Sequence, residues 1–108
     1  MPEGRLQGKV ALVTGAGAGI GAGIANVLAR EGARVYASDV DEAASAQTAE
    51  AIRASGGEAF DLALDVTKGQ DITAAFRRIE EVHGRLDVVV NNAGLNVRSD
   101  FRHLSDAD

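Results

Sequence analysis

Cysteine is absent from this 108-residue chain, and positive charge is scarce. Without cysteine there is no disulfide framework, no thiolate metal site and no thiol nucleophile. The same absence fits a reducing compartment, so we expect a cytoplasmic protein. The 11 Lys and Arg residues are outnumbered by 16 Asp and Glu residues, which gives a formal net charge of -5. A negative chain repels phosphate backbones and anionic lipid, which disfavours nucleic acids and membranes as partners and favours small molecules or proteins.

A long uninterrupted hydrophobic run is also missing. Residues 10–29 carry no charge, but five glycines interrupt this stretch, and its strongly apolar residues form a short run followed by helical spacing. That pattern predicts a strand and an amphipathic helix, and neither a membrane span nor a signal peptide. Proline occurs once whereas glycine occurs 13 times. The glycines therefore need an explanation.

The length and the order of the hydrophobic patterns indicate one α/β domain. Four apolar runs, at residues 9–14, 34–39, 58–64 and 86–91, alternate with helical patterns at 20–28, 41–54 and 72–82. The first residues of consecutive runs are separated by the length of a right-handed βαβ unit. We therefore predict a parallel sheet with helices on both faces.

Turn signals mark the ends of the predicted helices. Asp41 and Thr67 stand where the second and third helices begin, and Thr67 with Gln70 has the spacing of a capping box. We expect each helix to end in a left-handed glycine, at Gly32, Gly56 and Gly84.

The last residues of the sequence point to a longer domain. Residues 105–108 have the composition of the first turn of a fourth helix, with Ser105 as its cap. The valines at 88–90 show no polar alternation, so we expect neighbours on both faces and both edges of that strand. Residues 1–108 are therefore predicted to be the amino-terminal part of a single longer domain.

A glycine-rich turn at residues 14–21 connects the first strand to the first helix. Such a turn lets backbone amides approach a pyrophosphate, and the helix N-terminus favours its negative charge. Gly17, Gly19 and Ala22 also fit the G-x-G-x-x-G/A spacing, whereas a Walker loop is excluded because no Gly-Lys-Ser/Thr follows. The alternative is a tight turn that only packs the helix against the sheet.

Asp39 ends the second strand, where the adenosine ribose of a bound dinucleotide is expected to lie. A carboxylate at this place accepts hydrogen bonds from both ribose hydroxyls and repels a 2′-phosphate. The alternative is that Asp39 only helps to start the next helix, as Asp41 also could.

Three motifs together resemble the amino-terminal part of the short-chain dehydrogenase/reductase family. They are Thr-Gly-x-x-x-Gly-x-Gly at 14–21, Asp-Val at 65–66 and Asn-Asn-Ala-Gly at 91–94. The resemblance covers nearly the whole chain. It implies an α/β, Rossmann-type doubly wound parallel sheet with strand order 3-2-1-4. It also implies an NAD cofactor whose adenosine ribose is held by Asp39. The other cofactor-binding residues that it implies are Gly15, Gly19, Ile20 and Gly21 at the diphosphate, Asp65 and Val66 at the adenine, and Asn92, Ala93 and Gly94 beneath the ribose and nicotinamide.

Simpler roles stay open for some of these positions. Asp65 could be only a loop or cap acid, and residues 91–94 could be only a strand-ending turn. The resemblance implies that Asn91 mainly ties the fourth strand to its neighbours. We expect structural roles for both histidines, His83 and His103.

The residues that carry catalysis in the family do not appear in this sequence. They are an Asn in the next helix, a Ser after the fifth strand, and a Tyr and a Lys four residues apart. The only tyrosine, Tyr36, lies inside the second predicted strand, with no lysine four positions later. We therefore assign no catalytic residue and no metal ligand.

Two functions follow as hypotheses. The first is an NAD(H)-dependent oxidoreductase that transfers hydride between nicotinamide and an alcohol or carbonyl substrate, with this chain as its cofactor-binding part. The second is a truncated, non-catalytic NAD-binding module. A flavodoxin-like domain is disfavoured because its phosphate loop would not need Asp39. The resemblance also implies a homo-oligomer for the complete protein, and the sequence leaves the substrate open.

Overall fold

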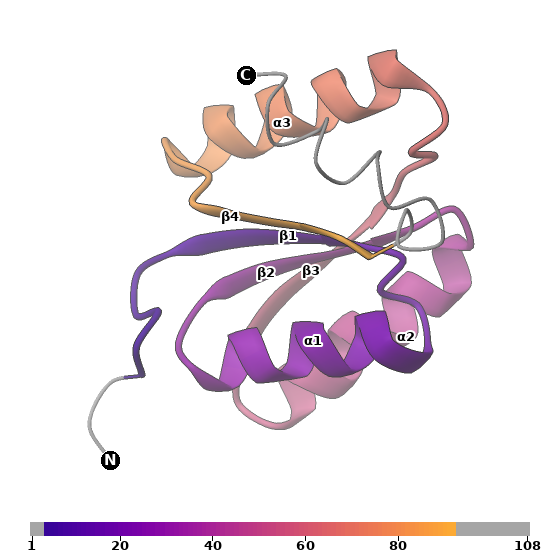
Figure 1. Cartoon of the computed structure of the whole chain (residues 1–108). Coiled ribbons are helices and arrows are strands. Elements are labelled where there is room, and N and C mark those ends of the chain that lie inside the picture. Colours follow the sequence, from indigo (N-terminus) through magenta and orange to yellow (C-terminus); the bar gives the residue numbers. More distant parts are fainter. Residues whose placement is uncertain (1–3, 93–108) are drawn as a thin grey trace.

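The computed structural model describes residues 4–92 of the chain. In this part of the chain, four strands alternate with three helices, as Figure 1 shows. The strands are β1 (Val10–Thr14), β2 (Arg34–Asp39), β3 (Glu58–Ala63) and β4 (Val88–Asn91). The helices are α1 (Gly19–Arg30), α2 (Glu42–Ala54) and α3 (Gly69–His83). The expected start of a fourth helix at 105–108 lies outside the described residues.

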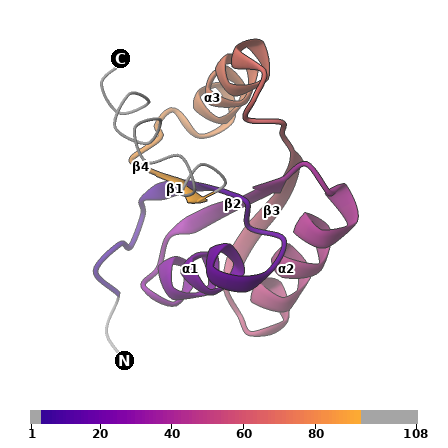
Figure 2. The same ribbon diagram turned by 45° about the vertical axis from the view of Figure 1, so that its right-hand side comes forward.

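The strands form one parallel sheet in the order β3-β2-β1-β4. In the centre of the sheet, Leu12 of β1 lies opposite Tyr36 of β2 on one side and Val89 of β4 on the other. Helices α1 and α2 cover one face and α3 covers the other (Figures 1 and 2). The predicted α/β architecture and strand order are confirmed.

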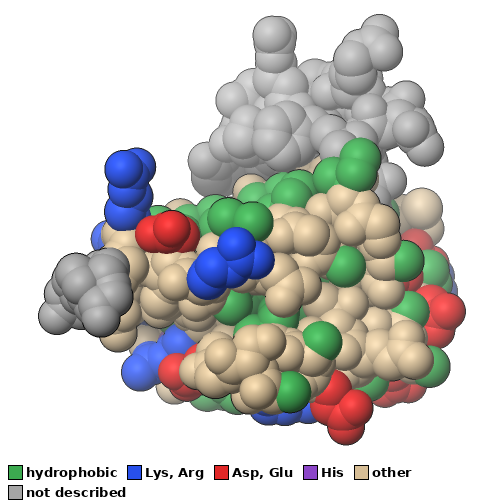
Figure 3. All heavy atoms as spheres, turned by 90° about the horizontal axis from the view of Figure 1, so that it is seen from below, with side chains coloured by type: hydrophobic (Ala, Val, Ile, Leu, Met, Phe, Trp, Pro, Cys, Tyr) green, Lys and Arg blue, Asp and Glu red, His purple; other side chains and the backbone are tan. Residues whose placement is uncertain are grey.

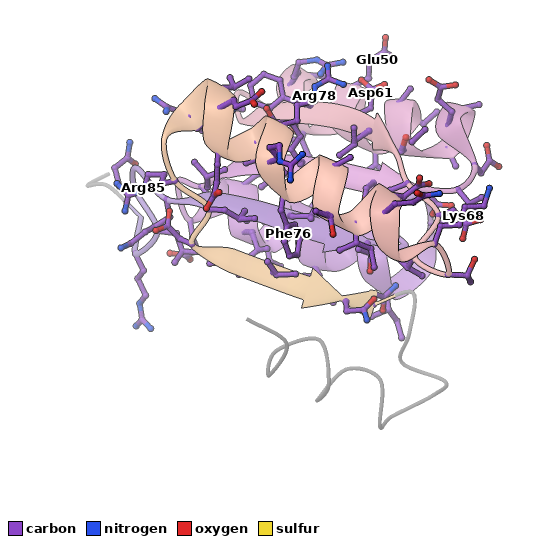
Figure 4. The ribbon with its side chains drawn as sticks, turned by 90° about the horizontal axis from the view of Figure 1, so that it is seen from above. Glu50, Asp61, Lys68, Phe76, Arg78 and Arg85 are labelled. Atoms are coloured by element: carbon purple, nitrogen blue, oxygen red, sulfur yellow. The ribbon has the colours of Figure 1, made fainter. Side chains whose placement is uncertain are left out.

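The two faces of the sheet bury different kinds of side chain. Against α1 and α2 the core consists largely of alanine and valine, together with Ile52 of α2. Against α3 it contains bulkier groups, including Leu12, Tyr36 and Ile79, with Phe60 and Phe76 packed beside them. Figure 4 shows Phe76 between α3 and the sheet, with Lys68 and Arg85 near opposite ends of that helix. Because both faces of β1 are covered, all five of its residues are buried, which explains its unbroken apolar sequence.

Most of the expected helix ends are confirmed. The Asp41 carboxylate accepts a hydrogen bond from the Ala44 amide at 3.2 Å and caps α2. The three expected glycines have left-handed backbones, with φ of 100° at Gly32, 96° at Gly56 and 75° at Gly84.

The predicted Thr67 cap is wrong. Lys68 is the residue that precedes α3, and no side chain caps the start of this helix. The Thr67 hydroxyl instead donates to the Asp65 carboxylate at 2.6 Å, and the Thr67 amide donates to the same oxygen at 2.9 Å. The Asp65 carboxylate therefore binds the Thr67 hydroxyl, which would otherwise have capped α3.

The fourth strand begins later than its apolar run predicts, at Val88 instead of residue 86. Just before it, the Asp87 carboxylate accepts hydrogen bonds from the Val10 amide at 2.9 Å and from Arg85 Nε at 2.8 Å. Within residues 4–92, β4 pairs with β1 alone, and Val89 is 41% exposed. Each helix of the described part of the chain falls short of the length and hydropathy that a transmembrane helix needs. Residues 10–29 form the predicted strand and helix.

Candidate functional site

The predicted site residues gather where the parallel strands end. Three segments meet at the carboxyl ends of the strands, at the right of the sheet in Figure 1: the turn after β1, the last residue of β2 and the polar end of β4. The structure brings the following predicted residues to this end of the sheet: Gly15, Gly19, Ile20, Gly21, Asp39 and Asn92. In open α/β sheets, ligands bind at the carboxyl ends of the strands.

The start of α1 suits an anion. Ala18 precedes the helix in an extended conformation, no side chain caps it, and its first turn contains no acidic residue. By contrast, α2 is capped by Asp41 and has Glu42 in its first turn. The amides at the start of α1 therefore remain available to a bound group, whose negative charge the helix dipole favours.

Gly19 leaves space for that group. Its φ is 60°, a conformation that L side chains rarely adopt, and a Cβ placed on it would meet no atom of residues 4–92 within 4 Å. Beside it, the Ile20 side chain is 71% exposed. The combination of an uncapped helix start and an open approach at Gly19 fits a dinucleotide pyrophosphate.

Gly21 has a different local role. It is buried, and a Cβ placed on it would overlap the carbonyl oxygen of Gly15. This glycine therefore allows α1 to pack closely against the turn that precedes it. The sequence left open that the glycine-rich turn only serves packing of the helix. Gly21 has such a packing role.

Asp39 connects the end of β2 to the glycine-rich turn. Its Oδ2 atom accepts a hydrogen bond from the Gly17 amide, and its Oδ1 atom accepts one from the Asp41 amide, both at 2.9 Å. A carboxylate has about four acceptor positions, so two remain for further donors such as ribose hydroxyls. The capping hydrogen bond to α2 comes from Asp41, and the Asp39 carboxylate holds the amide of that capping residue, so Asp39 also contributes to the start of α2.

Asp65 and Val66 follow β3 at the same carboxyl end of the sheet. The Leu64 amide donates to the Asp39 carbonyl at 3.1 Å, which keeps the ends of β3 and β2 together. Hydrogen bonds from the Thr67 hydroxyl and amide lower the pKa of Asp65. Asp65 thus has the local turn role that was left open, and Val66 is half-buried next to it.

The end of β4 is tied to β1 and to the turn. The Thr14 hydroxyl donates to the Asn91 side-chain oxygen at 2.8 Å, so Asn91 holds β4 against β1 as expected. The Asn92 side-chain amide donates to the Gly15 carbonyl at 3.1 Å. Ala93 and Gly94 lie outside the described residues.

Sequence reasoning missed three residues around this site. Ser38 Oγ donates to the Val13 carbonyl at 2.8 Å, and Thr48 Oγ1 donates to the Ala16 carbonyl at 2.7 Å. Val40, directly after Asp39, is 72% exposed. An apolar residue that follows a buried strand was the available signal for Val40, whereas nothing local in the sequence connects Thr48 to a residue 32 positions earlier.

Tyr36 lies on the α3 side of the sheet. Its ring is 7% exposed and stacks on Phe60, and its hydroxyl hydrogen-bonds His83 Nε2 at 2.8 Å. Burial raises the pKa of Tyr36. These contacts give Tyr36 and His83 structural roles between β2 and α3, as was expected for His83.

Known proteins resemble the chain in both sequence and fold. The short chain dehydrogenase family matches residues 9–108. "Probable oxidoreductase EphD" of Mycobacterium tuberculosis is 43% identical over 93% of this chain and 17% of its own length. A cyclopentanol dehydrogenase of Comamonas sp. is 47% identical over 85% of this chain and 37% of its own length.

Among solved structures, a hydroxysteroid dehydrogenase from Escherichia coli superposes with a TM-score of 0.78. It is 40% identical, and the match covers 81% of this chain and 37% of that protein. The chain thus spans well under half the length of these relatives. Since the family match extends over most of the sequence, this chain belongs to the short-chain dehydrogenase/reductase family.

Proposed function

We propose that the chain is the cofactor-binding portion of an NAD(H)-dependent oxidoreductase, with residues 1–108 forming the first part of a single longer domain. The observation that carries this proposal is the position of Asp39, which is fixed at the end of β2 by two backbone amides and bonded to the glycine-rich turn. A carboxylate held there is suited to a ribose diol next to a pyrophosphate.

Each part of the site has a task in this proposal. The amides near Gly19 and Ile20 hold the diphosphate, with Gly15 and Gly21 beside it. Gly21 contributes by allowing α1 to pack closely against the turn. Asp39 accepts hydrogen bonds from the adenosine ribose. Asp65 and Val66 border the adenine, while Asn92, Ala93 and Gly94 lie beneath the ribose and nicotinamide. When bound, the cofactor supplies a hydride acceptor or donor for an alcohol or carbonyl carbon.

The charges around the adenosine end favour NAD over NADP. Figure 3 shows acidic side chains on both sides of the α1 and α2 face, whereas most of the basic ones lie toward the left. A 2′-phosphate would meet the Asp39 carboxylate, and Ala18 provides no compensating cation. Arg34 begins β2 at the opposite end of the strand and pairs with Glu58 at 3.2 Å, so it is not placed to bind that phosphate.

Calorimetric titration with NAD and NADP tests this selectivity. The unmodified protein should bind NAD more tightly, and Asp39→Ala should weaken NAD binding and reduce the discrimination against NADP. Asp61→Ala, which removes an exposed carboxylate from β3, is the matched control and should change neither affinity. Tighter binding of NADP by the unmodified protein would overturn the assignment.

The alternative hypothesis of a non-catalytic NAD-binding module is less favoured, because the chain matches relatives named as an oxidoreductase and a dehydrogenase. One observation distinguishes the oxidoreductase from the binding module, namely whether the reading frame continues beyond Asp108 into a Ser and a Tyr-x-x-x-Lys motif. The wider proposal also includes small-molecule alcohols or carbonyl compounds as substrates, association of the complete protein into a homo-oligomer, and a cytoplasmic location.

A further inference from the structure

Thr48 makes an unusual contact for a threonine inside a helix. The Thr48 side chain is on α2 and the residue is 6% exposed, yet its hydroxyl donates at 2.7 Å to Ala16 in the glycine-rich turn. Hydroxyl side chains within helices often bond a carbonyl of the preceding turn. Ser45 within the helix and Ser55 directly after it do so, at 3.0 Å to Glu42 and 3.1 Å to Ala51.

The Ala16 carbonyl and the Gly17 amide belong to one peptide unit, which is planar and rigid. Thr48 binds the carbonyl at 2.7 Å, and Asp39 Oδ2 accepts a hydrogen bond from the amide at 2.9 Å. The two groups of a trans peptide point in opposite directions, so a rotation of this plane weakens both hydrogen bonds together. Thr48 and Asp39 are thus coupled through a single backbone unit.

The surroundings of the peptide leave it little freedom. Ala16 is fully buried, and its own amide donates to the Ser38 carbonyl at 2.8 Å. A Cβ placed on Gly17 would lie 2.6 Å from the Ala44 Cβ and 2.8 Å from Asp39 Oδ2. The turn is therefore held between α2 and the end of β2, with Thr48 as its buried polar contact from the helix.

We propose that Thr48 is a positioning residue for cofactor binding, because it fixes the 16–17 peptide and thereby the orientation of the Asp39 carboxylate toward the adenosine ribose. The proposal rests on the proposed function. It predicts an effect on the recognition of the ribose hydroxyls by a side chain that does not itself contact the ribose.

The test compares Thr48→Val, which removes the hydroxyl, with Thr48→Ser, which keeps it. The probes are NAD and an NAD analogue that lacks the adenosine 2′-hydroxyl, titrated calorimetrically into the intact protein. Loss of one positioning hydrogen bond should weaken NAD binding about three- to tenfold in Thr48→Val. The preference for NAD over the deoxy analogue should fall with it, and Thr48→Ser should restore both values to near those of the unmodified protein.

Two further variants separate positioning from general destabilisation. Ile52→Val shortens a buried side chain one helical turn after Thr48, and this apolar side chain makes no hydrogen bond to the 16–17 peptide. The variant should keep the NAD preference intact even though it lowers stability. In the Asp39→Ala background, Thr48→Val should have little additional effect on NAD affinity, because the carboxylate through which it acts is gone.

The outcomes distinguish this proposal from the function on which it rests. Failure of the unmodified protein to bind NAD would overturn both. If the unmodified protein binds NAD but Thr48→Val keeps the full preference over the deoxy analogue, only the role of Thr48 is overturned. Equal effects of Thr48→Val with and without Asp39 would likewise contradict the coupling.

Discussion

At the residue scale, Gly21 and Gly23 have opposite surroundings although both belong to α1. A Cβ on Gly21 would overlap the carbonyl oxygen of Gly15, whereas a Cβ on Gly23 would meet nothing within 4 Å. Neither residue has a left-handed backbone. Glycine is therefore required at position 21 by packing, while at position 23 it only adds flexibility to the unfolded chain.

We predict that Gly23→Ala raises the free energy of unfolding by about 0.5–1 kcal/mol, because alanine is the better helix former and its methyl group has space. Gly21→Ala should lower it by roughly 1–3 kcal/mol, since α1 must move away from the preceding turn. Urea denaturation of both variants measures these changes. Equal effects of the two substitutions would contradict the difference in packing.

At the scale of elements, the start of β4 depends on a carboxylate. The Asp87 side chain accepts hydrogen bonds from Arg85 and from the Val10 amide, and these partners lower the pKa of Asp87. Since the folded state binds this proton less tightly than the unfolded chain does, Asp87 stabilises the fold above its unfolded pKa. That contribution is lost as the pH falls through the folded pKa.

Asp87→Asn should therefore reduce the free energy of unfolding at neutral pH, and the deficit relative to the unmodified protein should shrink below about pH 4. Urea denaturation at several pH values measures the difference. Asp61→Asn, on the exposed edge strand β3, is the control and should show no such pH-dependent deficit. A deficit for Asp87→Asn that stays constant down to about pH 3 would contradict this role of the carboxylate.

The elements also show what the sequence could and could not predict. Parallel strands and helix ends were predictable because unbroken apolar runs and the glycines that follow helical patterns are local signals. The strand order instead depended on the resemblance to a family. The prediction that Thr67 caps α3 was wrong because the Thr67 hydroxyl donates to the Asp65 carboxylate instead. The glycine-rich turn and Asp39 were recognisable as motifs, whereas Thr48 was not, since its partner Ala16 is brought near only by folding.

At the scale of the whole molecule, the two edges of the sheet differ. The edge strand β3 carries the charged residues Glu58 and Asp61, which oppose pairing with another chain. The other edge strand, β4, consists of three valines and Asn91, and Val89 is 41% exposed. Within residues 4–92 its outer edge pairs with no strand. An apolar, unpaired edge of this kind recruits other chains.

We predict that the 108-residue chain self-associates in solution through the β4 edge. We also predict that it shows no dehydrogenase turnover, because residues 1–108 contain no Tyr-x-x-x-Lys, the motif that the family resemblance implies for proton transfer. Sedimentation velocity across a range of concentrations measures the association, and alcohol oxidation assays measure turnover. Val89→Lys should reduce the association, since a charge on an edge strand disfavours pairing. Val27→Lys, at a 50% exposed position of α1, should not, because that helix is not part of the β4 edge. A chain that stays monomeric and folds cooperatively would instead favour the self-sufficient binding module, because its β4 edge would then need no further strand.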